Sequence, residues 1–371
     1  MNLRRSLLPI HRWVGLTLGL VVLVSAVTGA GMAFREELDP LVYPHLFKAS
    51  ACAAPLPLDA FVERARALRP KGTVDYVRVR AEAGAPVQVR LLDKDTLFID
   101  RCTGALTGAQ NRYAGVFGVL EYLHRGQWIK NGGWIMGAGA LSMVLVLSSV
   151  GLFLWWPRKP RRFSQGFVVD QRLKGPMFTV SLHKTVGAWA VLFVTLSALT
   201  GLPNAYDSLK EAIVSIGATQ PEAKPKSTPP TPRGPKLPLQ DAWATVTRLS
   251  PGPQEVLLHL ARKARDPVEI FIIDADAPHA NARTYLYLDA YSGRVLRFAP
   301  YRQSALGSRI YYWMLSLHTG QVGGLVGQLL LFLGAVSIPV LAYTGFSSYL
   351  RRRFRKPKAR RTPAATAPAR S

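Results

Sequence analysis

Four of the seven histidines stand where apolar stretches begin, and paired imidazoles at such places can do redox chemistry. They are His11, His124, His183 and His318. Imidazole is the common axial ligand of haem iron, and two imidazoles from different helices give a six-coordinate site suited to electron transfer. A single ring at a membrane boundary is equally well explained as an interfacial residue. Four rings at repeated positions favour ligands.

A bare metal ion is the competing use of paired histidines. Zinc and ferrous iron normally require further carboxylate or thiolate ligands, and the sequence offers only Glu121 near these positions. Glycines near each histidine would admit a flat porphyrin, although they serve helix packing equally well. We therefore favour haem, and we expect the other three histidines, His45, His259 and His279, to be solvated or structural.

The histidines must be positioned by membrane helices. The composition is 49% hydrophobic with a mean hydropathy of +0.11, which is too apolar for an ordinary soluble domain. Four stretches reach the roughly 20 residues that a bilayer requires. They are Trp13 to Phe34, Trp134 to Trp156, Val180 to Leu202 and Leu325 to Phe346.

These spans form an internal repeat. The first reads IHRWVGLTLGLVVLVSAVTG and the third LHKTVGAWAVLFVTLSALTG, each with a Thr-Gly pair 17 residues after its histidine. The second and fourth follow LHRGQ and LHTGQ, each with a glycine 27 residues after its histidine. Two halves packed around a pseudo-twofold axis along the membrane normal would pair His11 with His183 and His124 with His318.

The net charge of +25 is concentrated beside the spans. Basic clusters precede the first span, fill the loop between the second and third, and follow the fourth, which places both termini in the cytoplasm. This placement explains the charge without nucleic-acid binding. In chain order we predict a cytoplasmic N-terminus (1–12), a first span (13–34), an exterior module (35–123), a second span (124–156), a cytoplasmic loop (157–182), a third span (183–203), a surface helix with a proline-rich linker (204–238), a second exterior module (239–317), a fourth span (318–350) and a basic cytoplasmic tail (351–371).

The exterior segments repeat more loosely. Each opens with a Leu-Pro-Leu that starts a helical stretch, followed by strand-like alternation and a turn with an aspartate and a glycine. The expected fold class is therefore membrane α-helical with two small α+β exterior modules. Cys52 and Cys102, the two cysteines, both fall in the first module, and we expect a disulfide between them in an oxidising compartment.

The motifs LHRG, LHTG, LHKTVGAW and the first-span IHRWVGL resemble the PepSY-associated transmembrane family over nearly the whole chain. That family is similar to bacterial inner-membrane siderophore reductases, including those that act on ferrioxamine. The resemblance implies two PepSY-like periplasmic domains. It also implies two b-type haems, with His11, His124, His183 and His318 as axial ligands.

We therefore expect an inner-membrane reductase that passes electrons from an unidentified donor to a ferric siderophore, with a hydroxamate such as ferrioxamine as an example. Its contacts would include membrane lipids and no nucleic acid. Candidate substrate-lining residues follow the two exterior histidines: Arg125, Gln127, Trp128 and Gln321. The alternatives are a haem-free PepSY anchor with a binding or regulatory role, and a permease for siderophore or iron. No nucleotide-binding or flavin-binding fingerprint is found in the sequence.

Overall fold

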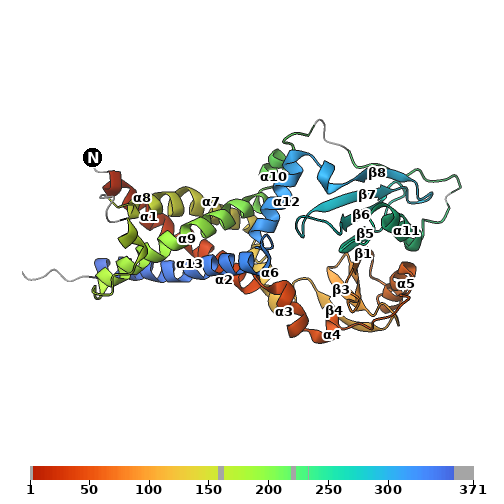
Figure 1. Cartoon of the computed structure of the whole chain (residues 1–371), viewed down its shortest axis with the longest axis horizontal. Coiled ribbons are helices and arrows are strands. Elements are labelled where there is room, and N and C mark those ends of the chain that lie inside the picture. Colours follow the sequence, from red (N-terminus) through yellow and green to blue (C-terminus); the bar gives the residue numbers. More distant parts are fainter. Residues whose placement is uncertain (1–2, 158–162, 219–222, 233, 355–371) are drawn as a thin grey trace, which may run out of the picture.

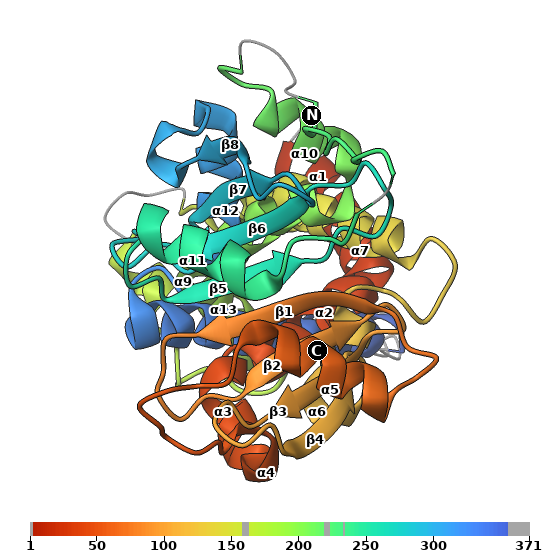
Figure 2. The same ribbon diagram turned by 90° about the vertical axis from the view of Figure 1, so that its right-hand side faces the viewer.

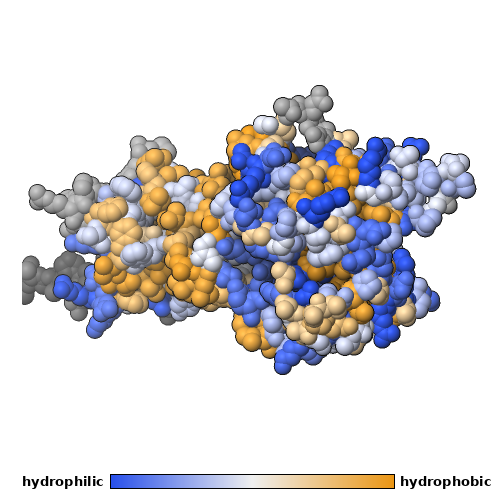
Figure 3. All heavy atoms as spheres, turned by 45° about the vertical axis from the view of Figure 1, so that its right-hand side comes forward, coloured by the Kyte–Doolittle hydropathy of each residue, from blue (hydrophilic) through white to orange (hydrophobic). Residues whose placement is uncertain are grey.

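The computed structural model describes residues 3–157, 163–218, 223–232 and 234–354. These residues form a bundle of helices with a β-sheet domain at one end, and the first and last described residues lie at the other end (Figure 1). The bundle surface is mainly hydrophobic and the sheet domain is largely hydrophilic (Figure 3). Residues 158–162 of the predicted cytoplasmic loop, 219–222 and 233 of the predicted linker, and 355–371 of the predicted tail lie outside the described residues.

Three helical stretches are long and apolar enough to cross a membrane. They are Gly132–Trp155, which comprises α7 (Gly132–Ser142), a π-helical stretch (Met143–Ser148) and α8 (Ser149–Trp155), then α9 (Pro176–Ala205) and α13 (Gly324–Arg353). A fourth is formed if α1 (Leu3–Leu16) and α2 (Leu18–Met32), which meet at 54°, count as one span.

The bend between α1 and α2 corrects the expected continuous helix from Trp13. It falls at Thr17, whose hydroxyl donates to the Trp13 carbonyl at 2.8 Å, beside the helical bond from the Thr17 backbone N–H to the same carbonyl at 3.1 Å. Gly15 and Gly19 flank the bend and lower the cost of the distortion. The first span is therefore a broken helix that ends at Met32.

The second and fourth spans do not begin at histidines, which corrects the boundaries at 124 and 318. Instead, α6 (Gly115–His124) and α12 (Leu306–His318) each end at the histidine, and α7 and α13 start several residues later. Gly126 and Gly320 adopt φ values of 66° and 76°, a left-handed conformation that ends a helix. The third span also differs, because α9 already begins at Pro176, ahead of His183.

The exterior strands make one sheet, where two separate modules were expected. Strand order is β4-β3-β2-β1-β5-β6-β7-β8, and β1 pairs with β5 antiparallel, from Tyr76 opposite His259 to Arg80 opposite Glu255. The strands are β1 (Val74–Arg80), β2 (Val87–Leu91), β3 (Asp95–Ile99), β4 (Leu106–Asn111), β5 (Glu255–His259), β6 (Val268–Ile273), β7 (Arg283–Leu288) and β8 (Val295–Ala299).

Two helices cover one face of this sheet, α5 (Leu58–Leu68) and α11 (Leu239–Leu249). Both lie on the side away from the bundle (Figures 1 and 2). Alternate strand residues such as Val77, Leu258 and Ile270 point to this side and are fully buried against the two helices. The opposite strand residues therefore face the bundle.

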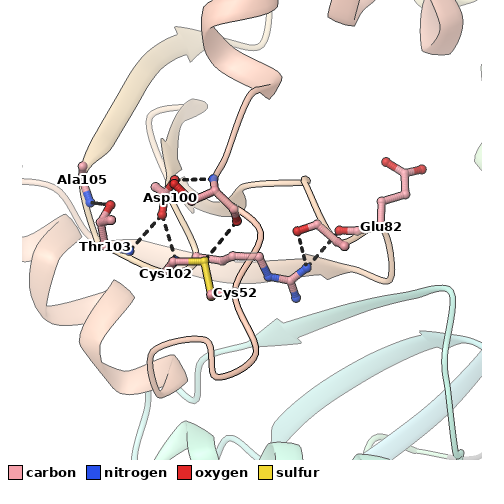
Figure 4. The surroundings of a disulfide bond; sticks show 9 residues. Cys52, Glu82, Asp100, Cys102, Thr103 and Ala105 are labelled. Carbon is pink, nitrogen blue, oxygen red and sulfur yellow. Dashed lines mark hydrogen bonds between the residues drawn. A yellow bond between two sulfur atoms is a disulfide. The ribbon is translucent and has the colours of Figure 1, made fainter.

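A buried carboxylate organises the turn after β3. The carboxylate of Asp100 accepts from the backbone N–H groups of Ser50, Cys102 and Thr103 at 2.6, 2.8 and 2.9 Å (Figure 4). Burial opposes the charge, yet these hydrogen bonds hold the pKa of Asp100 well below its usual range. Cys102 forms a disulfide with Cys52 across this turn, with 5.9 Å between the Cα atoms.

The same turn recurs after β7. Asp289 accepts from the backbone N–H groups of Thr228, Tyr291 and Ser292 at 2.8, 3.0 and 3.0 Å. Thr228 belongs to the proline-rich segment that was predicted to be a linker. Its described residues are extended but hydrogen-bonded to the sheet domain, for example from Leu237 N–H to the Ala290 carbonyl at 2.8 Å.

Short helices join the two parts of the molecule. They are α3 (Arg35–Val42), α4 (Pro44–Phe47) and α10 (Asp207–Val214). The helix α10, which we expect to lie on the membrane surface, packs on α12. A Cβ added at Gly307 of α12 would lie 2.0 Å from the Ile213 carbonyl oxygen, so this contact between the two backbones requires glycine.

Candidate functional site

The structure brings the four histidines together in two pairs. His11 of α1 faces His183 of α9 with ring centroids 6.4 Å apart, near the end of the bundle that carries the termini. We call these two residues the distal pair. His124 of α6 faces His318 of α12 at 6.1 Å, beside the sheet domain, and these form the sheet-side pair. The pairing is the one that the internal repeat predicts.

The two pairs are separate sites. Gly201 packs against the ring of His318, and it lies 18 residues after His183 on the unbroken helix α9. At 1.5 Å per residue the pairs are about 27 Å apart. An apolar cluster occupies the bundle between them, made of Val22, Met143, Ala190, Val194 and Ile338. One small cofactor cannot be ligated by both pairs.

The sheet-side rings are oriented through their Nδ1 atoms. Nδ1 of His124 lies 3.0 Å from the carbonyl oxygen of Ser25, and Nδ1 of His318 lies 2.9 Å from that of Ser197. A carbonyl only accepts, so each Nδ1 carries the proton and each Nε2 keeps a free lone pair. This is the usual arrangement of a histidine that ligates a metal.

The distal rings are held differently. Nδ1 of His183 lies 2.9 Å from the hydroxyl of Thr344, and this hydroxyl donates to the Val340 carbonyl at 2.7 Å. The threonine oxygen can therefore accept a hydrogen bond from the Nδ1–H of His183. Nδ1 of His11 is buried without a hydrogen-bond partner among the described residues.

Each ring also rests on a glycine of another helix. A Cβ added at Gly201 would lie 2.8 Å from Cε1 of His318, and one at Gly29 would lie 3.3 Å from Cε1 of His124. Gly151 and Gly345 take the same position against the distal pair, at 3.1 Å and 3.6 Å. These glycines were recognised in the sequence as markers of the repeat. Their contact with the histidines was missed, although the spacings that recur in both halves, 18 residues for Gly29 and Gly201 and 27 for Gly151 and Gly345, were a usable signal.

The geometry fits a metal held between two imidazoles. Two rings that bind one iron from opposite sides, each at a metal–nitrogen distance of about 2.0 Å, have centroids roughly 6 Å apart. Both pairs match this separation. No group of three or more His, Cys, Asp or Glu residues that could hold a metal ion exists among the residues described. The donor set therefore suits a cofactor that supplies its own equatorial ligands, as haem does, better than a bare ion.

Sequence reasoning assigned Glu121 no structural role. It lies one helical turn before His124, and its carboxylate binds Arg112 at 2.5 Å and Arg35 at 3.0 Å. Burial disfavours the ionised form, but the hydrogen bonds from Arg112 and Arg35 outweigh it and lower the pKa of Glu121. The charged cluster ties α6 to α3, and so it fixes the helix end that carries His124.

The four predicted substrate-lining residues lie in the turns that follow the sheet-side pair. Arg125, Gln127 and Trp128 are exposed in the turn after His124. Gln321 is held in place, because its amide donates to Glu36 at 3.1 Å and its oxygen accepts from Asn281 at 3.2 Å. Gln321 thus links α3 to the sheet domain.

The remaining histidines do not join either pair. His279 is buried, with Nε2 2.9 Å from the Tyr301 hydroxyl and Nδ1 2.9 Å from the Ser316 hydroxyl, which is a structural role. His45 is exposed, and His259 lies on the sheet with Nδ1 3.7 Å from Asp75.

Long apolar helices, a polar sheet domain at one end and two histidine pairs within the bundle define a multi-pass membrane protein with an extramembrane domain. The chain belongs to the PepSY-associated transmembrane family, since the family model of the PepSY-associated TM region matches residues 8–352. A comparison with curated proteins gives no match.

Proposed function

We propose that this protein is a transmembrane electron-transfer protein with two b-type haems, which reduces a ferric siderophore on the side of the sheet domain. One observation carries the proposal. Two pairs of facing histidines lie at opposite ends of one apolar bundle, with centroid separations of 6.4 Å and 6.1 Å. Bound between such rings, haem supplies a one-electron carrier at each end of the bundle.

The protein's own residues perform three tasks. The Ser25 and Ser197 carbonyls fix the tautomer of the sheet-side rings, so that Nε2 is the ligating atom. The glycines opposite the rings leave space for them, and the apolar bundle excludes water. His11 with His183, and His124 with His318, would hold the two haems, and a paired imidazole at each site would leave no position for small molecules such as oxygen.

The choice of a ferric siderophore is supported by the family resemblance and by the chemistry of iron. Hard oxygen ligands bind ferric iron tightly and the softer ferrous ion far less tightly, so one electron per iron is sufficient for release. A hydroxamate such as ferrioxamine is one such substrate. The residues Arg125, Gln127, Trp128 and Gln321 lie beside the sheet-side pair and are candidates for contact with it.

The electron donor is proposed to approach the distal pair. A cavity of about 430 Å³ opens at this end, and its lining includes Lys184, next to His183, together with Arg4 and Trp156. The basic clusters beside the spans support an inner-membrane location with both termini in the cytoplasm. A reporter fused after Ser371 is then expected to behave as cytoplasmic and one inserted at Gly84 as periplasmic, and the opposite result would overturn this orientation.

We further propose that the chain arose by duplication of a unit with two spans and one PepSY-like module. Each half contributes one helix and four antiparallel strands to the sheet domain, in the same order. Each half also contributes one histidine to each pair. A duplicated unit with one histidine at each end of its spans therefore accounts for the two matching imidazoles at each site.

The test is spectroscopic. Purified protein should be red, with Soret and α bands of bis-imidazole haem and two haems per chain by the pyridine haemochrome assay. Dithionite-reduced protein should be reoxidised by ferric siderophores under nitrogen. Colourless protein after haem-supplemented expression would refute the proposal in favour of an anchor or regulatory protein, and siderophore uptake without reduction would favour a permease.

A further inference from the structure

The face of the sheet that looks toward the bundle carries an unusual set of side chains. Two rows of directly paired residues cross it. The first runs Arg90, Tyr76, His259, Glu269, Tyr287 and Arg297 from β2 to β8, and the second runs Gln88, Arg78, Leu257, Phe271 and Tyr285 from β2 to β7. Side chains paired in this way lie about 5 Å apart and interact. Both rows are rich in aromatic rings and arginines.

The aromatic rings form a continuous chain across four strands. Centroids of Tyr76 and His259, of His259 and Phe271, and of Phe271 and Tyr285 are each 4.9 Å apart. The Tyr285 hydroxyl then contacts the hydroxyl of Tyr312 on α12. Except for the contact with Tyr312, these rings are partly exposed on a face that no helix of the sheet domain covers.

Arginines border the rings, and two of them have no carboxylate partner. Guanidinium carbons lie 6.0 Å from the Tyr76 centroid for Arg90, and 5.8 Å from that of Phe271 for Arg283. Neither arginine has an ion pair with a described residue, and Nε of Arg90 is buried without a hydrogen-bond partner among them.

The carboxylates on this face are already occupied. Glu255 pairs with Arg80 at 3.1 Å and Arg78 at 3.6 Å, and Glu269 pairs with Lys224 at 2.5 Å. Burial and the nearby Glu269 raise the pKa of Tyr287, so this hydroxyl keeps its proton at neutral pH. The arginines outnumber the carboxylates on this face, so it is positively charged. Nη1 of Arg90 donates to the Lys94 carbonyl at 2.8 Å, while Nε of Arg90 and Nε of Arg78 have no hydrogen-bond partner among the described residues.

We infer that this cationic aromatic face, formed by Tyr76, Arg78, Arg90, His259, Phe271, Arg283 and Tyr285, binds an anionic ferric chelate with aromatic ligand groups, of the tris-catecholate class. Planar rings and guanidinium groups stack on aromatic chelating groups, and arginine donates to anionic oxygens. A neutral or cationic tris-hydroxamate has no aromatic chelating rings to stack on this face and no net negative charge to attract its arginines. The inference rests on the proposed function and narrows its substrate.

The location of the face suits that role. Tyr312 belongs to α12 and lies six residues before His318, about 9 Å along the helix. Arg283 lies 5.7 Å from the Tyr312 ring centroid, so the cationic aromatic face reaches the helix that carries the sheet-side histidine. A chelate bound there lies on the route to the sheet-side pair.

Binding can be measured without any electron transfer. Gallium(III) has no accessible lower oxidation state in water, so its tris-catecholate and tris-hydroxamate complexes report affinity alone. The haem-loaded full chain in detergent would be titrated with each complex by calorimetry. We expect the trianionic catecholate complex to bind at least tenfold more tightly, with affinity that falls as salt is added.

Arginine variants locate the site. Arg90→Gln and Arg283→Gln should each weaken catecholate binding about tenfold, the usual effect of removing one charge-assisted hydrogen bond. Arg64→Gln on α5 and Arg248→Gln on α11 are the matched controls, because both arginines are exposed on the opposite side of the sheet. An unchanged far-ultraviolet circular dichroism spectrum and melting temperature in every variant, with or without haem, show that the fold is retained.

Two outcomes would overturn the inference. One is tighter binding of the neutral gallium hydroxamate than of the catecholate complex. The other is an equal loss of catecholate affinity in the variants of the cationic aromatic face and in the control variants on α5 and α11. The proposed function fails by a different result, namely protein without haem or haem that ferric chelates do not reoxidise. Gallium binding by the cationic aromatic face would remain measurable in either case.

Discussion

Replacing the histidines singly and in pairs tests the arrangement of the two sites most directly. His124→Ala and His318→Ala each remove one axial ligand from the sheet-side pair, where the two ring centroids are 6.1 Å apart. Because both rings serve one site, either change should lower the haem content from two per chain to one, or convert one haem to high spin. The other haem should stay low spin.

The magnitude follows from the separation of the pairs. Effects of changes in one site are strongly non-additive, whereas sites more than about 10 Å apart behave independently. The pairs are about 27 Å apart along α9. The double variant H124A/H318A should therefore retain one haem, as each single variant does, while H11A/H124A should retain none in the bis-imidazole form.

The assay combines the pyridine haemochrome stoichiometry with low-temperature electron paramagnetic resonance, which separates low-spin from high-spin haem. His45→Ala is the matched control, because His45 is exposed and far from both pairs in the sequence. If H11A and H318A disturb the same haem, or if H124A/H318A leaves no low-spin haem although each single variant keeps one, the side-by-side pairing is refuted.

Three further predictions concern residues that support the site. Gly201→Ala should perturb the spectrum of the sheet-side haem, because the added Cβ would lie 2.8 Å from Cε1 of His318. Gly345→Ala should leave the distal haem unchanged, because its Cβ would lie 3.6 Å from Cε1 of His183. Equal spectral changes in the two variants would contradict this prediction. Glu121→Gln should destabilise the sheet side by roughly 1–3 kcal/mol in thermal melts at pH 7, since it breaks charge-assisted contacts with partly exposed arginines. Folding lowers the pKa of Glu121, so its contribution to stability is present above the unfolded pKa of about 4.5 and is lost as the pH falls below that value. A stability difference between wild type and Glu121→Gln that is as large at pH 3 as at pH 7 would contradict this. Reduction of the Cys52–Cys102 disulfide should add the mass of two hydrogens and remove up to about 4 kcal/mol of loop-closure stabilisation. The lost stability should be detected as faster proteolysis of the sheet domain. Free thiols in unreduced protein would contradict the presence of the bond.

The sequence was sufficient to find the spans and the pairing of the histidines, because both depend on patterns that repeat. Hydrophobic length identifies a span, and equal spacing in the two halves places His11 opposite His183 and His124 opposite His318. The break at Thr17 was missed because the apolar run continues through it. The helix ends at His124 and His318 were missed because the glycines that follow, Gly126 and Gly320, were interpreted as space for a cofactor or as helix-packing residues, and not as helix ends.

The single sheet could not be predicted from local patterns. Alternation of polar and apolar residues identifies strands, but it does not say which distant strands pair. Two separate modules would each leave an exposed edge, at β1 and at β5, with unpaired backbone groups. Their pairing removes both edges and makes a face wide enough for the two rows of aromatic and arginine side chains. The Nδ1 contacts to the Ser25 and Ser197 carbonyls were equally hidden, because a backbone acceptor has no sequence signature.

The joined sheet also has a consequence for the sheet-side pair. The helices α6 and α12 each follow directly from one half of the sheet, and each ends at a histidine of this pair. Glu121 anchors α6 through Arg112, which follows β4, and Tyr312 anchors α12 through Tyr285 on β7. If the halves were free to move, the two rings would move independently and the 6.1 Å separation would not be maintained. Pairing of β1 with β5 connects α6 and α12 through one rigid sheet. The joined sheet therefore forms the cationic aromatic face and also holds the imidazoles of His124 and His318 at the distance that one metal centre would require.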